Sequence, residues 1–380
     1  MALLAHLFSL KVRLPDLLYA SSQNKSELNM KAKPDTSFFC PTAVRSSNRS
    51  AFATLLMLND SYLPGALLQA YQLRRQAVQA DLLCLVTPDI STAARQALGQ
   101  LFDFVVEVEK IYVPHDRAQR RQYLPYVFTK LHALRLGPDG DLGFAYDKVA
   151  LLDADLLPLR QFGDLLALPA PAGVLNEHKS HLLAAADGRF VIPPSVARQK
   201  TWRWHQIYAA YPHGQPIPRH ITDRVVTEPG NMGINGALMV MQPSLAEYHA
   251  IRRDLQRPTT RHLVSSLFDW PDMQYLTMFW SGRWHNVDVR YSSLNGYPDL
   301  RILYGTHYAG VKPWHNGRSS SLSCYARYPD FQYWFRQYRA MLTRHHPGLQ
   351  RYKGLRRLLE TVTALITPPV ASEQAAERAG

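Results

Sequence analysis

Short apolar runs alternate with amphipathic stretches from residue 50 to about residue 168. Each apolar run is nearly continuous, which is typical of a strand that is buried on both faces. The stretches between them repeat apolar residues with a period near 3.6 and predict helices. The predicted strands are 51–60, 80–89, 102–111 and 148–159, and the predicted helices are 61–76, 90–102 and 125–136. This alternation indicates βαβ units and therefore an α/β fold with a mostly parallel sheet.

The second half of the chain is less regular. Residues 176–230 are rich in His, Arg, Pro and aromatic residues without a clear period, and we interpret them as an insertion or lid-like excursion. A strand is predicted at 233–244, followed by helices at 244–256 and 271–284. The domain organisation predicted from these patterns is a flexible leader at 1–49, a folded domain at 50–330, and a basic helical C-terminal extension and tail at 331–380.

Composition narrows the function classes only slightly. The 380 residues are 46% hydrophobic and 19% charged, so the chain can bury a substantial core. Its formal charge of +13 suits nucleic acid, an anionic membrane or a phosphorylated small molecule. The densest basic stretch, 336–357, holds seven Lys and Arg and no acid. We favour a solvated basic helix over an anion-binding surface there. No nucleic-acid partner is expected, because the sequence has no RNP, zinc-finger or homeodomain pattern.

The three cysteines, Cys40, Cys84 and Cys324, are few, odd in number and widely spaced. They therefore favour neither a disulfide framework nor a cysteine-based zinc site. No apolar run reaches the ~20 residues that span a bilayer, so no transmembrane anchor is expected. The N-terminus lacks a basic segment ahead of its apolar patch. We expect a soluble cytoplasmic protein, with a cleaved organellar leader as the open alternative.

The usual phosphate-binding loops are missing. The sequence contains no GxxxxGK[ST], and no GxGxxG follows the first predicted strand. A parallel α/β sheet still binds ligands at the carboxyl ends of its strands. Candidate chemistry is therefore expected at those strand ends.

Two aspartates, Asp153 and Asp155, interrupt the apolar run at 148–159. Buried carboxylates are costly without a partner, and residues i and i+2 at a strand end project to the same side. Two converging carboxylates suit Mn²⁺ or Mg²⁺. The alternative is that they cap a helix that begins near Gln161. A second Asp-x-Asp, Asp139 and Asp141, lies in a Gly/Pro loop, where solvated aspartates need no explanation.

Two further segments carry candidate groups. In "GTHYAGVKPWHN", His307 is a candidate metal ligand, and Lys312 follows Gly310 as a point charge for a phosphate. A surface turn with a hydrogen-bonded His is the alternative. In "DWPDMQYL", Asp269 and Asp272 stand near a predicted helix start. Helix N-capping explains one of these acids, and the second is available to bind a sugar hydroxyl.

Six segments, taken in order, resemble glycosyltransferase family 8, the glycogenin-like and galactinol-synthase-like enzymes. They are "TLLMLNDSYLPGALLQAYQLR", "FTKLHALRL", "KVALLDADLLPL", "GINGALMVMQPS", "PDMQYLTMFW" and "HYAGVKPW". The resemblance covers roughly Phe52 to Trp314. It implies a GT-A fold, with a Rossmann-like, mostly parallel nucleotide-binding sheet and acceptor-side additions. It also implies a UDP-sugar donor, a Mn²⁺ ion with Mg²⁺ as the alternative, retention at the anomeric carbon, and a hydroxyl acceptor on a sugar, polyol or protein. The oligomeric state stays open, a dimer included.

The resemblance also assigns residues. The uridine pocket would contain Leu56, Leu58, Asn59 and Tyr62. A donor-binding basic pair would be Arg121 and Lys130. The metal ligands would be Asp153, Asp155 and His307, with the backbone of Ala154 near the ribose. Asn235 and Gly236 would lie beside the donor sugar, and Asp269 and Asp272 would bind the transferred or acceptor sugar. Gly310 and Lys312 would hold the diphosphate.

Two features depart from the family pattern. Asp272 is followed by Met273 where glycogenin-like enzymes often carry Asp-Gln, and no self-glycosylated tyrosine is identifiable. The reaction that the resemblance implies is transfer of a hexose, glucose or galactose, for which we favour front-face attack of the acceptor. The alternatives are a metal-dependent sugar-nucleotide pyrophosphorylase or nucleotidyltransferase, and a non-catalytic basic binding module on a degenerate GT-A scaffold.

Overall fold

The structure is a computed structural model that describes ten stretches of the chain. They are 49–118, 121–175, 183–184, 190–191, 211–228, 231–295, 300–315, 322, 325–326 and 328–367. All belong to one compact unit, Arg45–Gly380. Almost all of the predicted leader, most of the 176–230 excursion and the tail after 367 lie outside the described residues, so those predictions stay untested.

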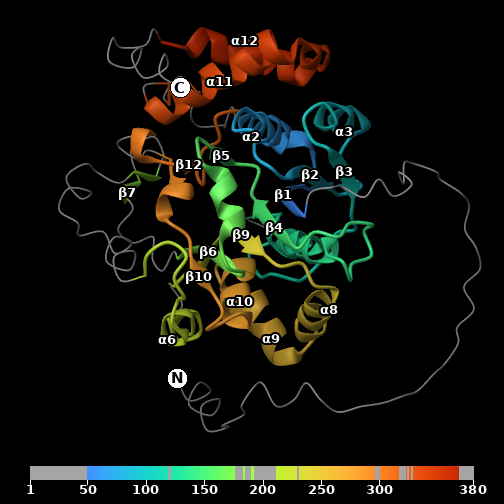
Figure 1. Cartoon of the computed structure of the whole chain (residues 1–380), viewed down its shortest axis with the longest axis vertical. Helices are drawn as coiled ribbons and strands as arrows, with labels where there is room; N and C mark the ends of the chain where they lie inside the picture. Colours follow the sequence, from blue (N-terminus) through green and yellow to red (C-terminus); the bar gives the residue numbers. More distant parts are fainter. Residues whose placement is uncertain are drawn as a thin grey trace, which may run out of the picture. The chain divides into compact units, whose positions relative to one another are not determined.

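A seven-stranded sheet forms the centre of the unit, in the order β10-β6-β9-β4-β1-β2-β3 (Figure 1). Its strands are β1 (Ser50–Leu56), β2 (Asp81–Val86), β3 (Phe104–Glu107), β4 (Lys148–Leu152), β6 (Ala172–Leu175), β9 (Ile234–Met241) and β10 (His285–Asn286). β1 pairs in parallel with β2 and β4, and β2 pairs in parallel with β3. β9 runs antiparallel to both β4 and β6. The predicted α/β class with a mostly parallel sheet is confirmed.

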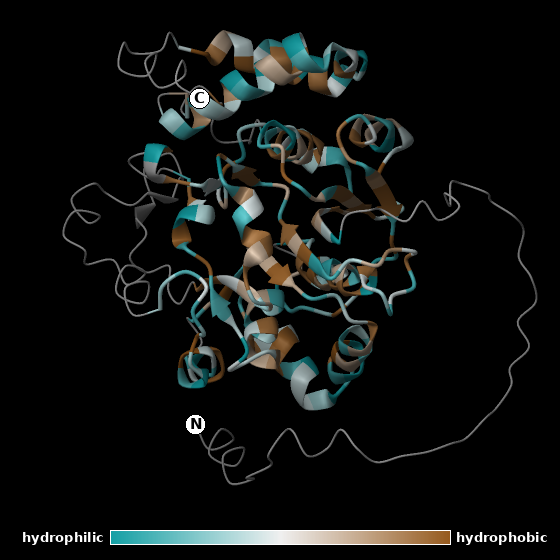
Figure 2. Ribbon diagram, in the orientation of Figure 1, coloured by the Kyte–Doolittle hydropathy of each residue, from teal (hydrophilic) through white to brown (hydrophobic). Residues whose placement is uncertain are grey.

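Helices cover both faces of this sheet, so its central strands are buried on both sides. Phe52 of β1 belongs to the core shared with α2 (Leu63–Arg75) and α3 (Thr92–Leu98), whereas its neighbour Ala53 belongs to the opposite core. That second core includes η3 (Leu124–Leu136), α8 (Leu245–Asp254) and α10 (Pro271–Phe279). Figure 2 shows apolar residues concentrated on the central strands. The predicted helix at 125–136 is present, although η3 is a 3₁₀ helix.

The remaining elements are short. The helical turns are η2 (Asp60–Tyr62), η4 (Phe162–Ala167), α6 (Arg219–Thr222), α7 (Arg224–Thr227), α9 (Pro258–His262), η5 (Leu263–Leu267), η6 (Val289–Tyr291) and η7 (Leu300–Ile302). β7 (Leu183–Ala184) pairs with β8 (Phe190–Val191). A second sheet has the order β11-β12-β5, from β11 (Ser293–Leu294), β12 (Gly305–His307) and β5 (Leu156–Pro158). This small sheet connects the segment after β4 to the segment that contains His307.

The C-terminal helices pack on the core. They are α11 (Pro329–Ala340), η9 (Met341–His345), η10 (Pro347–Arg351) and α12 (Lys353–Leu365). Arg75 of α2 donates a 2.7 Å hydrogen bond to Gln337, and Tyr338 donates one of 3.1 Å to the Leu355 carbonyl. Trp334 is fully buried in the same core as α2. The described part of the extension, 331–367, is thus largely helical, and it also closes one side of the core. Among the described residues, no helix has the length and apolarity needed to cross a membrane.

The predicted strand at 148–159 is wrong in one respect. β4 ends at Leu152, and β5 begins at Leu156 in the other sheet. A hydrogen-bonded turn of four residues, Asp153 to Leu156, separates them, and we call it the metal turn. The two carboxylates therefore belong to a turn at the carboxyl end of β4 and not to strand positions.

Candidate functional site

Backbone hydrogen bonds hold the metal turn in place. The Leu156 N–H donates to the Asp153 carbonyl over 2.9 Å, which closes the turn. The Asp153 N–H donates to Ala237 O on β9, and the Tyr308 N–H donates to Asp155 O after β12, each over 2.9 Å. Two strands distant in sequence thus fix the turn from either end.

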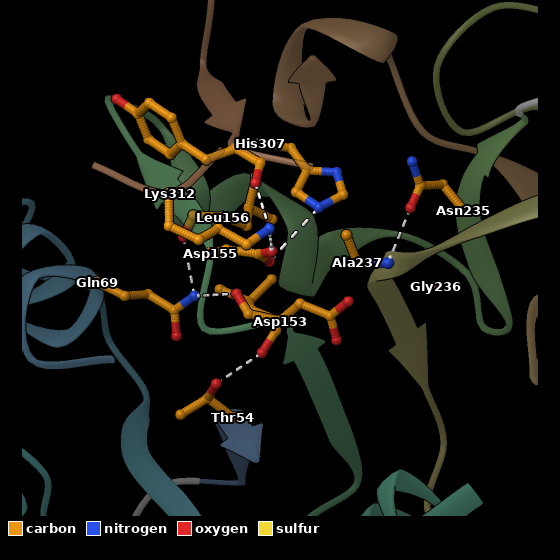
Figure 3. Close-up of polar contacts among 12 residues, drawn as sticks. Thr54, Gln69, Asp153, Asp155, Leu156, Asn235, Gly236, Ala237, His307 and Lys312 are labelled. Carbon is orange, nitrogen blue, oxygen red and sulfur yellow. Dashed lines mark hydrogen bonds and ion pairs between the residues drawn. The ribbon is translucent and has the colours of Figure 1, made fainter. Parts of the chain in front are cut away.

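Asp153, Asp155 and His307 form the cluster predicted to bind a metal. One ligand atom from each lies within 4.8 Å of the others (Figure 3). His307 Nε2 is 3.4 Å from Asp155 Oδ1, a buried oxygen that has no hydrogen-bond donor of suitable geometry. An orphaned carboxylate oxygen beside a second carboxylate and an imidazole fits a divalent cation, and this O, O, N donor set suits Mn²⁺.

Lys312 neutralises the buried end of this cluster. Its Nζ lies 2.5 Å from Asp155 Oδ2 and donates to the Tyr308 carbonyl. Burial opposes ionisation of Asp155, but the charges of Lys312 and His307 outweigh it and hold the pKa of that carboxyl below its usual range. Asp155 is therefore an ionised ligand at any pH near neutral.

Lys130 connects the metal turn to a second carboxylate. From η3, its Nζ lies 2.6 Å from Asp272 and 3.5 Å from Asp153, and it donates to the Gly236 carbonyl over 3.3 Å. Burial disfavours the ammonium, yet these two carboxylates raise the pKa of Lys130 above its ordinary value. Lys130 thus forms ion pairs with two protein carboxylates, whereas the resemblance assigns it to donor binding.

Asp272 stands in the first turn of α10 and is buried. The capping residue of that helix is Trp270, which makes no side-chain cap, so the prediction that Asp269 or Asp272 caps the helix is wrong. Lys130 explains the burial of Asp272, because a buried carboxylate needs a partner of opposite charge. Asp269 is more exposed and pairs with Arg117 over 2.5 Å.

Asn235 and Gly236 are the second and third residues of β9, and Gly236 lies next to this ion pair. Asn235 Oδ1 accepts a 2.9 Å hydrogen bond from the Ala237 N–H. A Cβ on Gly236 would meet Asp272 Oδ2 and Lys130 Nζ, each at 3.1 Å. A glycine at this position therefore lets β9 approach the Lys130–Asp272 pair closely.

The predicted uridine residues follow β1. Leu58 has a φ of 71°, a left-handed backbone that costs energy for a branched residue, and its N–H donates to Thr87 Oγ1 over 3.2 Å. Asn59 accepts from the Ser61 N–H over 2.9 Å and starts η2. Leu56 is buried at the end of β1. These residues lie where a parallel sheet binds ligands, at the carboxyl end of a central strand.

Tyr62 joins the uridine segment to the Lys312 segment. Its ring lies 5.7 Å from Lys312 Nζ, and it meets Trp314 edge-on with the ring centroids 5.7 Å apart. Burial, and after it the Asp155 charge, raises the pKa of Tyr62, so its hydroxyl stays protonated. Gly310 is half-buried in the turn between His307 and Lys312.

Arg121 does not accompany Lys130 into the buried cluster. Its guanidinium lies 4.7 Å from the centre of the Trp270 ring. Because Trp270 stands between the two predicted sugar-binding acids, Arg121 still borders the same region. Of the predicted basic pair, Lys130 is therefore buried and Arg121 is exposed.

Three residues of the site were missed. The Thr54 hydroxyl donates to the Leu152 carbonyl over 2.8 Å, and Gln69 donates to both ends of the metal turn. Gly65 faces the Ala154 carbonyl at a distance that leaves no room for a side chain. A polar residue within an apolar strand and a glutamine on an apolar helix face are weak signals in one sequence, since neither carries obvious chemistry.

The alternatives for the aspartates are resolved by contacts. Gln161 precedes η4 and receives no side-chain cap, so Asp153 and Asp155 do not cap that helix. The second pair was expected to be simply solvated, but it has partners. Asp141 pairs with Arg135 over 2.6 Å, and Asp139 accepts from the Leu245 N–H over 3.0 Å.

Comparison with known proteins places the chain among glycosyltransferases, although no protein-family model matches it. An uncharacterised protein of Acanthamoeba polyphaga mimivirus is 25% identical over 276 residues, which is 70% of this chain and 82% of that protein. Galactinol synthase 1 of Ajuga reptans is 23% identical over 70% of this chain and 74% of its own length. Glycogenin-2 of Homo sapiens is 37% identical over 119 residues, which span 30% of this chain but only 22% of glycogenin-2.

These relatives confirm the predicted resemblance and support the enzyme class of a hexosyltransferase. The chain is therefore similar to glycogenins and galactinol synthases, in agreement with the predicted resemblance to glycosyltransferase family 8.

Proposed function

We propose that this protein is a retaining hexosyltransferase that moves glucose or galactose from a UDP-sugar to a hydroxyl acceptor, with a divalent metal on the diphosphate. The observation that carries the proposal is the cluster of Asp153, Asp155 and His307, whose ligand atoms lie within 4.8 Å of one another. It stands at the carboxyl end of β4, in a chain related to family 8.

Asp153, Asp155 and His307 would hold Mn²⁺, with Mg²⁺ as the alternative. A bound ion of this kind supplies Lewis-acid stabilisation of the negative charge that grows on a departing diphosphate. Lys312 adds a positive charge beside Asp155, and its ammonium group would contact the same diphosphate. Tyr62 would form a wall of the nucleotide pocket next to Lys312.

The sugar would lie between the metal turn and α10. Lys130 holds one oxygen of Asp272, which leaves the other oxygen for a sugar hydroxyl. Because Asn235 Oδ1 already accepts from the Ala237 N–H, Asn235 would present its amide N–H groups to the donor sugar. Arg121 and Asp269 border this region at the surface and would contact the acceptor or the outer part of the donor.

Retention would follow from front-face attack. The acceptor oxygen bonds to the anomeric carbon on the face from which UDP leaves, and the acceptor proton passes to the departing phosphate oxygen. The protein groups orient both partners and stabilise the charge on the leaving group.

The test is release of UDP from UDP-glucose and UDP-galactose with and without Mn²⁺. Asp153→Ala and Asp155→Ala should each lower metal-dependent UDP release by about 100-fold or more, because each removes one metal ligand. Asp141→Ala is the matched control: it removes an aspartate from the other Asp-x-Asp and should keep full activity. Circular dichroism checks that each variant folds.

The same assay separates the alternatives. Wild-type activity in both metal-turn variants would contradict the metal role. Release of pyrophosphate from a nucleoside triphosphate and a sugar phosphate would point to a nucleotidyltransferase. Isothermal titration of UDP-glucose and UDP-galactose with Mn²⁺ present would identify the donor.

A further inference from the structure

We infer that Gln69 of α2 is a positioning residue for the proposed metal site, because its side-chain amide closes the metal turn. Gln69 Nε2 donates to the Asp153 carbonyl over 2.8 Å and to the Leu156 carbonyl over 2.9 Å (Figure 3). The side chain is only 2% exposed. The inference deepens the proposed function and rests on it, since it concerns how the metal ligands are held.

The chemistry of a primary amide explains why a glutamine suits this position. An NH₂ group carries two donors, and here each donor meets one carbonyl of the turn. Asp153 and Leu156 are the first and last residues of the turn, so the amide bridges its two ends. The Asp153 carbonyl also accepts the Leu156 N–H, and the turn is therefore closed twice. A buried carbonyl without a donor costs free energy, which makes the bridge stabilising.

The bridge matters for metal binding because both carboxylates hang from this turn. Asp153 and Asp155 are its first and third residues, so the turn's backbone dihedrals set the separation and direction of the two carboxylates. In Figure 3, Gln69 reaches the turn from α2 while the Asp153 carboxylate points away from it. Gln69 thus contacts the backbone of the metal turn and leaves both carboxylates available.

Gly65 provides a second contact between α2 and the metal turn. It lies four residues before Gln69, hence on the same face of the helix. A Cβ on Gly65 would lie 2.3 Å from the Ala154 carbonyl oxygen and 2.5 Å from Trp314 Cη2. The glycine therefore allows the helix to approach the middle of the turn, while Gln69 binds its two ends.

The same helix offers a matched control. Gln72 is also buried in α2, but its Nε2 faces the Tyr333 hydroxyl of α11 at 3.3 Å and not the metal turn. Gln69→Leu and Gln72→Leu remove the same chemical group from the same helix. Only the first of these variants removes a contact with the metal turn.

The experiment is calorimetric titration of Mn²⁺, alone and with UDP, into the full-length wild type and both variants. Gln69→Leu should weaken Mn²⁺ binding about tenfold or more, as for other residues that orient metal ligands, and Gln72→Leu should keep wild-type affinity. Gly65→Ala should weaken Mn²⁺ binding in the same direction. The midpoint of thermal unfolding is measured without metal, so that loss of fold is seen separately.

Two outcomes would overturn the inference in distinguishable ways. Wild-type Mn²⁺ affinity in folded Gln69→Leu, or equal losses in Gln69→Leu and Gln72→Leu, would show that Gln69 has no specific role and would leave the proposed function intact. Absence of Mn²⁺ binding in the wild type, with and without UDP, would overturn the proposed function and the inference with it. If Gln69→Leu fails to fold, Gln69→Asn, which keeps the amide on a shorter chain, provides the same comparison.

Discussion

The chain contains Asp-x-Asp twice, and the two copies have different environments. Asp141 receives two hydrogen bonds from Arg135, at 2.6 and 2.8 Å, and about half of its side-chain surface is exposed. In the metal turn, Asp155 is buried between Lys312 and His307. The loop pair lies at the surface, where Asp139 and Asp141 are both exposed, so water still solvates both carboxylates.

The difference shows that the environment, and not the motif, creates the candidate site. An ion pair at the surface contributes little, because water screens it and competes for both partners. A carboxylate in the interior requires opposite charges that the fold brings to it, here Lys130 and Lys312. Only the second arrangement leaves a buried carboxylate oxygen, Asp155 Oδ1, without a donor.

The largest effect on stability is expected from Lys130. Lys130→Met would leave the buried Asp272 carboxylate without its cation. It would also remove a positive charge that lies 3.5 Å from Asp153. We expect the free energy of unfolding to fall by about 3 kcal/mol, measured by urea denaturation. A loss below 1 kcal/mol, as at a surface pair, would erase the distinction between the two Asp-x-Asp environments.

The next largest effect is a loss of stability in acid, and it is expected from His132, which contacts the Arg135 partner of Asp141. His132 Nδ1 faces an Arg135 N–H at 2.9 Å, so this nitrogen accepts, and Nε2 donates to the Glu109 carbonyl. Burial, and then the Arg135 charge, lowers the pKa of His132 to about 4 from an ordinary 6.5. Protonation would place a hydrogen on Nδ1 against the guanidinium that holds Asp141.

Protonation of His132 should destabilise the folded protein as the pH falls. Between pH 6.5 and 4 the unfolded chain binds more protons at His132 than the folded chain, so stability is complete above pH 6.5 and falls as the pH is lowered. The loss should approach about 3 kcal/mol near pH 4. Urea unfolding at pH 7, 5.5 and 4.5 measures it, and His132→Gln should show a shallower dependence. Identical pH profiles for the two proteins would contradict the assignment.

The smallest effects are expected at the loop pair itself. Asp141→Ala removes an ion pair in which the aspartate is exposed, and it should lower the free energy of unfolding by less than about 1 kcal/mol. Asp139→Ala removes an acceptor from the first N–H of α8 and should cost about 1 kcal/mol at most. Chemical denaturation of both variants gives these values. A change in Mn²⁺ affinity in either variant would show that the loop pair takes part in the site.

Periodicity alone predicted much of the scaffold. The apolar runs at β1, β2, β3 and β9 and the amphipathic helices α2, α8 and α10 lie close to where the pattern places them. Hydrophobic spacing is a local property that survives in one sequence, because a buried strand and a half-buried helix each need a regular apolar face. The break between β4 and β5 was missed, since apolar residues continue on both sides of the metal turn.

The sequence by itself determined the candidates, and the tertiary structure decided their partners. Asp153, Asp155, His307 and Lys312 were identified from residue type, order and the family resemblance. Sequence spacing does not reveal that Lys130 pairs with Asp272, about 140 residues away, or that Gln69 closes the metal turn. Such contacts form only when strands and helices pack, because hydrogen bonds and buried ion pairs depend on distances of a few ångströms between residues far apart in the chain.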